Sequence, residues 1–107
     1  MVYRHAVMLT ALLLICATAV AAPDAQRQAQ LEHLLTQDCG ACHGLHLTGG
    51  LGPELTRVAL AGKSRDSLIT TVAQGRPGTA MPGWAPLLSP GDIRWLVDLL
   101  LQGYPAP

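Results

Sequence analysis

The sequence feature that most constrains this chain is the five-residue stretch Cys39-Gly40-Ala41-Cys42-His43. Two cysteines three positions apart on a helical turn present both thiols to the same side. Each thiol can add to one vinyl group of a haem, and the histidine that follows can turn its imidazole toward the iron as the proximal ligand. The motif therefore predicts one haem c, attached covalently through Cys39 and Cys42, with His43 as an axial iron ligand.

Covalent haem attachment requires export, and the N-terminus has the pattern of a secretory signal peptide. Arg4 gives a positive first segment, residues 6–20 are apolar or small, and Ala19-Val20-Ala21 is a small-residue cleavage pattern. We expect residues 1–21 to be cleaved as a signal peptide, leaving one small domain of residues 22–107 in the periplasm.

Two other interpretations of this leader stay open. An uncleaved membrane anchor is one, although the apolar stretch of about fifteen residues is shorter than the roughly 20 that a spanning helix needs. A lipoprotein site at Cys16 is the other, and Ile15 is bulky where such sites carry Gly or Ala. With the leader removed, we expect no membrane span.

Removal of the leader changes the cysteine count and the net charge of the chain. Cys16 leaves with it, so both remaining cysteines belong to the motif and no thiol is left for a disulfide. Loss of Arg4 leaves six basic and seven acidic residues, a net charge of −1 with histidine neutral. No basic stripe exists, which argues against a nucleic-acid partner. A chain this small without Phe buries a thin core, which a haem would complete; we expect a monomer.

Cys-x-x-Cys also occurs in zinc sites, dithiol redox proteins and disulfides. A zinc site needs two further ligands at finger-like spacing, whereas the available histidines, His33, His43 and His46, are clustered. A thioredoxin-type protein needs alternating strand and helix patterns, which are absent. An exported chain with this single motif and no other cysteine favours haem.

Helix signals recur along the mature chain. The clearest set marks the last helix, with Ser89 as N-cap, Pro90 at its first position, Asp92 three residues after the cap and Gly103 at its end. The other predicted helices are 24–38 with Asp24 as cap, 54–61 ended by Gly62, and 65–74 capped by Ser64. The expected buried stripes are Leu31, Leu34 and Leu35; Leu68, Ile69 and Val72; and Ile93, Leu96, Val97 and Leu100.

Two stretches between these helices, residues 44–53 and 75–83, are rich in glycine and proline and are predicted to be irregular loops. Glycines there let the backbone approach a flat ligand closely. No run of alternating polarity predicts a strand, so the expected fold class is all-α.

Met81, in the second loop, is the only methionine outside the leader. A methionine is usually core filler, but this one stands between Ala80 and Pro82 in a stiff loop, which favours the role of sixth iron ligand. A thioether ligand raises the reduction potential. The competitors are His46, three residues after His43, and His33, on the outer face of the first helix.

Three further residues are candidates for binding the haem. The Pro53 carbonyl can accept the second N–H of His43, which would fix the imidazole, or Pro53 can simply stiffen its loop. Trp84 can pack on the haem or donate its N–H to a propionate, and Arg76 can neutralise a propionate or stay solvated. Trp95 is expected in the core.

Taken together, these motifs resemble the class I c-type cytochromes: 39–43, Gly52-Pro53-Glu54-Leu55, the run from Gly75 to Trp84, and the helix after Ser89. The resemblance covers residues 24–103. It implies about four helices around one covalently attached haem, with the first and last helices crossing. It also implies His43 and Met81 as axial ligands and the Pro53 carbonyl on the His43 N–H.

Within that class, residues 75–101 look like the small periplasmic cytochromes encoded beside cytochrome cd1 nitrite reductase in denitrifying bacteria. The resemblance implies a one-electron carrier that donates to that reductase, or alternatively a maturation factor for haem d1 or the reductase. One departure is the missing Phe at the helix crossing, which leaves Leu31, Leu34, Leu35, Trp95 and Tyr104.

No catalytic acid, base or nucleophile is placed for chemistry, so we expect an electron-transfer protein and not an enzyme. A gas-binding or peroxidatic haem protein, in which Met81 detaches, is a third possibility.

Overall fold

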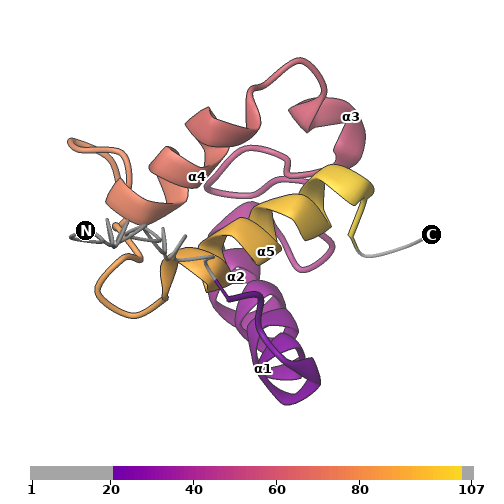
Figure 1. Cartoon of the computed structure of the whole chain (residues 1–107). Coiled ribbons are helices and arrows are strands. Elements are labelled where there is room, and N and C mark those ends of the chain that lie inside the picture. The colour runs from indigo at the N-terminus through magenta and orange to yellow at the C-terminus, as the bar shows by residue number, and fades with distance from the viewer. Residues whose placement is uncertain (1–20, 105–107) are drawn as a thin grey trace, which may run out of the picture.

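The computed structural model describes residues 21–104; residues 1–20 of the expected signal peptide, Cys16 included, lie outside this range. The described residues form four helical segments and no strand, which confirms the all-α class; their arrangement is drawn in Figure 1. The segments are α1 (Ala25–Leu34), which continues through the π-helical η1 (Leu35–Cys39) into α2 (Gly40–His43), then α3 (Arg57–Leu60), α4 (Arg65–Gln74) and α5 (Pro90–Gln102). Among these helices, none has the length and apolar character needed to span a membrane.

The predicted N-caps are confirmed. The Asp24 side chain accepts a hydrogen bond from the Arg27 N–H at 2.8 Å, and the Ser64 hydroxyl accepts one from the Ser67 N–H at 3.0 Å. Ser89 and Asp92 form a reciprocal capping box at the start of α5. These bonds satisfy backbone donors that have no partner inside the helix.

Two boundaries differ from the sequence expectation. The short helix begins at Arg57 instead of residue 54, because the Thr56 side chain caps it by accepting the Ala59 N–H at 3.2 Å. The first helix does not end at residue 38; it changes to a π-helical turn at Leu35 and continues to His43. The Cys39–His43 motif therefore lies at the end of one long helix.

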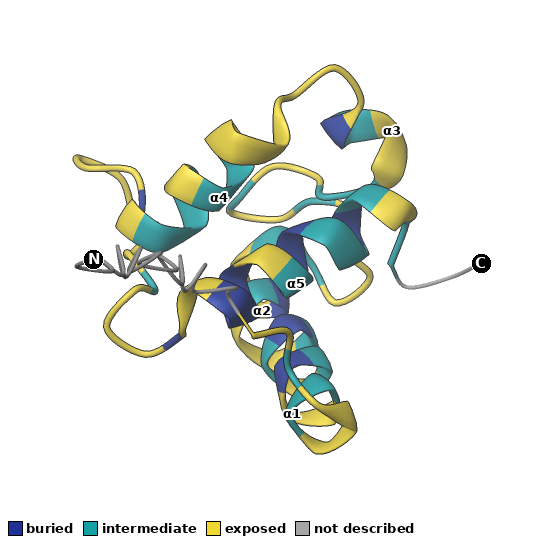
Figure 2. Cartoon of the chain, viewed as in Figure 1, coloured by how far each residue is buried: buried dark blue, intermediate teal, exposed yellow. Residues whose placement is uncertain are grey.

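Helix α5 is the centre of the core (Figure 2). Its predicted stripe is buried, as are Leu31 of α1 and Leu35 of η1, while Leu34 and Trp95 pack partly buried against them. Leu47 of the first loop, Leu60 of α3 and Leu88 complete the buried cluster. In contrast, α4 has no fully buried residue, and Leu68, Ile69 and Val72 are only partly covered.

An ion pair joins α1 to α5 where they come together. Arg27 donates from Nη2 to Asp92 Oδ2 at 2.8 Å and from Nε to the same oxygen at 3.3 Å. Asp92 is 7% exposed and also accepts the Ser89 N–H at 3.2 Å. The hydrogen bond from Arg27 holds the pKa of the Asp92 carboxyl below its ordinary value.

We expect Asp92→Asn to lower the free energy of unfolding by about 2 kcal/mol at pH 7, because it removes a charged acceptor shared by Arg27 and Ser89. The matched control is Asp98→Asn, whose pair with Arg65 at 2.6 Å is 40–45% exposed and should cost under about 1 kcal/mol. Denaturant unfolding of the haem-loaded proteins measures both.

The pH dependence follows from the direction of the Asp92 shift. Since its folded-state pKa is depressed, the pair stabilises fully above the ordinary carboxyl value of 3.8 and is lost as pH falls through the lower folded value. The loss caused by Asp92→Asn should therefore be complete above about pH 5 and shrink below about pH 4. An equal loss at pH 3 and pH 7 would contradict this assignment.

Candidate functional site

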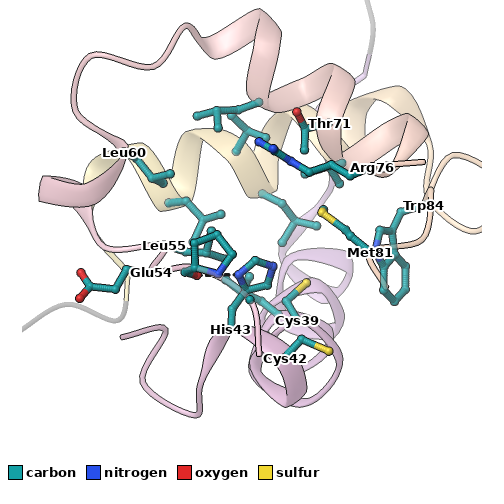
Figure 3. Close-up of a pocket in the computed structure, with 18 of the residues that line it drawn as sticks. Cys39, Cys42, His43, Glu54, Leu55, Leu60, Thr71, Arg76, Met81 and Trp84 are labelled. Carbon is teal, nitrogen blue, oxygen red and sulfur yellow. Dashed lines mark hydrogen bonds between the residues drawn. The ribbon is translucent and has the colours of Figure 1, made fainter. Parts of the chain in front are cut away.

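A cavity of about 740 Å³ lies between the two irregular loops, with α4 and α5 forming further walls (Figure 3). Its size is within the roughly 300–1,000 Å³ typical of cofactor pockets. The structure brings all of the predicted site residues to this one cavity: Cys39, Cys42, His43, Pro53, Arg76, Met81 and Trp84. His33 and His46 do not line it, and both are exposed.

The two thiols lie on the same side of the helix end and face the cavity (Figure 3). Cys39 is half-buried, Cys42 is exposed, and neither forms a disulfide. Burial, with the nearby Asp38 carboxylate adding to it, raises the pKa of the Cys39 thiol to about 11. Cys39 is therefore an uncharged group against an apolar wall in the chain without haem.

The π-helical turn just before the motif is a feature that sequence reasoning missed. In this turn the Gly40 N–H donates to the Leu35 carbonyl, five residues back instead of four. Leu35, at the start of this turn, is buried in the core and also lines the cavity, and Cys39, at its end, reaches the same cavity. Such turns inside α-helices often occur at functional sites, but no residue pattern in 35–39 announces one.

The His43 imidazole is held by a hydrogen bond to the backbone. Its Nδ1 lies 2.7 Å from the Pro53 carbonyl oxygen (dashed in Figure 3). A carbonyl can only accept, so Nδ1 carries a proton, and in the neutral imidazole Nε2 then keeps its lone pair. That tautomer is the one a metal-binding imidazole needs. The loop is tied to the same helix end, since Gly49 N–H donates to the His43 carbonyl at 2.8 Å.

Met81 extends its sulfur from the second loop into the cavity, with the His43 ring on a different wall (Figure 3). The loop closes on itself: Arg76 N–H donates to the Met81 carbonyl at 3.2 Å. The Thr79 hydroxyl donates to the Arg76 carbonyl at 2.7 Å and accepts the Met81 N–H at 3.3 Å. The sequence analysis did not predict this role for Thr79. The available signal was a hydroxyl side chain two residues before Met81 in a turn-rich loop.

The base of this loop is anchored to α4. The backbone N–H of Trp84 donates to the Val72 carbonyl at 2.9 Å. Gly75 has a φ of +70°, and a methyl group there would lie 2.6 Å from the Gly83 nitrogen, so the two loop ends pass very close together. These contacts make a stiff loop that presents Met81 from a fixed base.

The polar groups of the cavity are few and lie at its margin. Arg76 is exposed and extends toward the cavity near Thr71, while Trp84 is half-buried beside Met81 (Figure 3). Lys63 lines the same cavity and was not predicted. The carboxylates Asp38 and Glu54 also line the cavity, as do Thr71 and Thr79, while the rest of the wall is mainly apolar. The two cations can pair with a ligand that carries carboxylates on a hydrophobic body.

These residues fit a covalently attached haem. Two thiols, an imidazole with Nε2 available and a thioether all reach one apolar cavity, and this soft and nitrogenous donor set suits haem iron. In residues 21–104, no three His, Cys, Asp or Glu side chains come close enough together to hold a metal ion, so the zinc alternative has no ligand set there.

Comparison with known proteins agrees with this geometry. Residues 26–100 match the family model described as cytochrome C oxidase, cbb3-type, subunit III. The chain therefore belongs to the cytochrome c family.

Its similarity to individual proteins is more specific. The chain is 64% identical over 111 residues to cytochrome c55X of Stutzerimonas stutzeri, covering 99% of this chain and 98% of that protein. Among solved structures it is similar to the c-type cytochrome NirC, with a TM-score of 0.77 and 67% identity over 79% of this chain and 100% of that chain. This likeness confirms the class I cytochrome c fold that the sequence implied.

A further solved structure, the dihydro-heme d1 dehydrogenase NirN in complex with DHE, matches at 36% identity with a TM-score of 0.64. That match covers 70% of this chain and 16% of the dehydrogenase.

Proposed function

We propose that this chain is a periplasmic one-electron carrier with a single haem c, attached through Cys39 and Cys42 after the signal peptide of residues 1–21 is cleaved. His43 and Met81 are the proposed axial ligands. The single observation that carries the proposal is the meeting of both thiols, the oriented imidazole and the only methionine of the described chain in one cavity.

When bound, the haem supplies an iron that changes between ferrous and ferric states by one electron. The residues of the chain hold and insulate it. The Pro53 carbonyl orients the His43 ring, and the closed 75–83 loop presents the Met81 thioether. Leu96, Val97 and Leu100 form an apolar back wall that excludes water. Arg76 and Trp84, which line the same cavity, would bind the propionates.

The proposed partner is a redox protein such as cytochrome cd1 nitrite reductase. Supporting this, the first loop carries two exposed apolar side chains, Leu45 at 78% and Leu51 at 83% exposure, and Leu51 lines the mouth of the cavity. A near-neutral chain with a small apolar rim suits the brief encounters of electron carriers. We propose that the carrier acts as a monomer.

A second candidate is a role in maturation of haem d1 or of the reductase. The observation that favours it is the similarity to a segment of dihydro-heme d1 dehydrogenase. A dehydrogenase releases electrons, and a carrier of this kind can accept them.

Rapid mixing distinguishes the two roles. We expect the purified mature protein to carry the added mass of one haem, to change its visible spectrum reversibly with dithionite, and to be oxidised rapidly by cd1 nitrite reductase when reduced. Reduction of the ferric protein by dihydro-haem d1 dehydrogenase with its substrate, without oxidation by the nitrite reductase, would support maturation. A protein of unmodified mass and no colour, made in a host able to attach haem, would contradict both.

A further inference from the structure

Gly52 lies directly against the imidazole of His43. A methyl group at this position would lie 2.8 Å from both Cε1 and Nδ1 of the ring and 3.3 Å from Cγ. The φ of Gly52 is outside the left-handed region that favours glycine. Space, and not backbone conformation, therefore requires a residue without a side chain here.

The backbone on either side of Gly52 is held against the ring. The Gly52 N–H donates to the Cys42 carbonyl at 2.7 Å, and its carbonyl accepts the Gly50 N–H at 3.0 Å. The next residue, Pro53, accepts the His43 Nδ1–H at 2.7 Å. A side chain at position 52 must therefore displace either the His43 ring or the backbone of residues 52 and 53, which three hydrogen bonds hold in place.

We propose that Gly52 is a positioning residue for the His43 imidazole: its bare α-carbon sets the ring orientation in which Nδ1–H reaches the Pro53 carbonyl. This inference rests on the proposed iron ligation by His43. A strong hydrogen bond to a carbonyl makes the imidazole a better electron donor, which stabilises ferric iron. Displacing the ring weakens that bond and should raise the reduction potential.

The test uses the haem-loaded protein with Gly52→Ala and two matched controls. In Gly50→Ala the added methyl would lie equally close, 2.7 Å, to the Cys42 carbonyl oxygen, with no ring atom among its nearest contacts. In Gly62→Ala, a positive-φ glycine, nothing lies within 4 Å of the methyl. The readouts are the reduction potential and the NMR resonances of the His43 ring protons in the reduced protein.

We expect Gly52→Ala to raise the potential and shift the His43 ring resonances, Gly62→Ala to lower stability alone, and Gly50→Ala to have the smaller effect on the ring. Equal ring shifts in Gly50→Ala and Gly52→Ala would overturn the inference, because loop disturbance would then suffice. Wild-type behaviour of a loaded Gly52→Ala protein would overturn it too.

One measurement needs no variant. In the reduced wild-type protein, the α-protons of Gly52 should show a strong nuclear Overhauser effect to the His43 ε1 proton, and its absence would overturn the inference even if Gly52→Ala fails to load haem. A different result would contradict the proposed function itself. If the His43 ring protons lacked the large chemical shift of an iron-bound imidazole, His43 would not be an iron ligand, independently of the role of Gly52.

Discussion

Replacing both Cys39 and Cys42 with alanine is expected to leave a chain that accumulates no covalent haem and loses cooperative folding. The reason is the uneven distribution of the core. Helix α4 has no fully buried residue, and its apolar side chains Leu68 and Val72 line the cavity together with the half-buried Leu55. Without the haem, this half of the molecule has little to pack against.

The energetic scale supports a large loss of stability. Fully burying an aliphatic side chain stabilises by about 1.5–3 kcal/mol, and the haem would supply the uncovered share for these three half-buried side chains. That loss is a large part of the roughly 5–15 kcal/mol total stability of a typical domain. The far-UV circular dichroism and thermal transition of the double variant measure the outcome. Cys39→Ala and Cys42→Ala alone are the controls, since each keeps one thioether and should stay folded with reduced stability.

A stable, helical, haem-free double variant would show that the polypeptide core suffices by itself. The two single variants also test how much stability each cysteine contributes. Cys39 is half-buried and Cys42 exposed, so Cys39→Ala should cost more stability than Cys42→Ala.

Replacing Met81 with leucine is expected to lower the reduction potential and to open the iron to external ligands. Leucine keeps the apolar volume in the cavity but has no sulfur, so the effect isolates ligation from packing. Axial ligands move haem potentials over about 0.8 V, and we expect the fall to be a tenth or more of that range. Carbon monoxide should then bind the reduced protein rapidly at neutral pH.

The matched control is Leu87→Ala, which trims an exposed apolar side chain outside the cavity, 72% accessible. It should leave the spectrum and the potential unchanged. An unaltered visible spectrum in Met81→Leu would remove Met81 from the iron. Rapid carbon monoxide binding by the wild-type protein would instead favour the gas-binding alternative, in which Met81 detaches.

Much of the fold was predictable because its signals are local. The capping residues Asp24, Ser64 and Ser89 each act on a backbone N–H three positions away, so their sequence patterns suffice. The predicted stripe on α5 is buried because its period matches a helix. The later start of α3 also has a local signal, because its cap Thr56 accepts the Ala59 N–H three residues further on, and the sequence analysis overlooked it. The π-helical turn was not predictable, since no residue pattern in 35–39 encodes it.

By itself, the sequence determined the groups on which the proposed attachment depends: two thiols and an imidazole at a spacing that needs no tertiary contact. Only the tertiary structure decided which groups face that turn. The Pro53 carbonyl meets His43, and Met81 reaches the same cavity from a loop far along the chain, because loop closure and the burial of α5 bring them there. For the same reason, only the folded chain showed that Gly52 leaves room for the His43 ring.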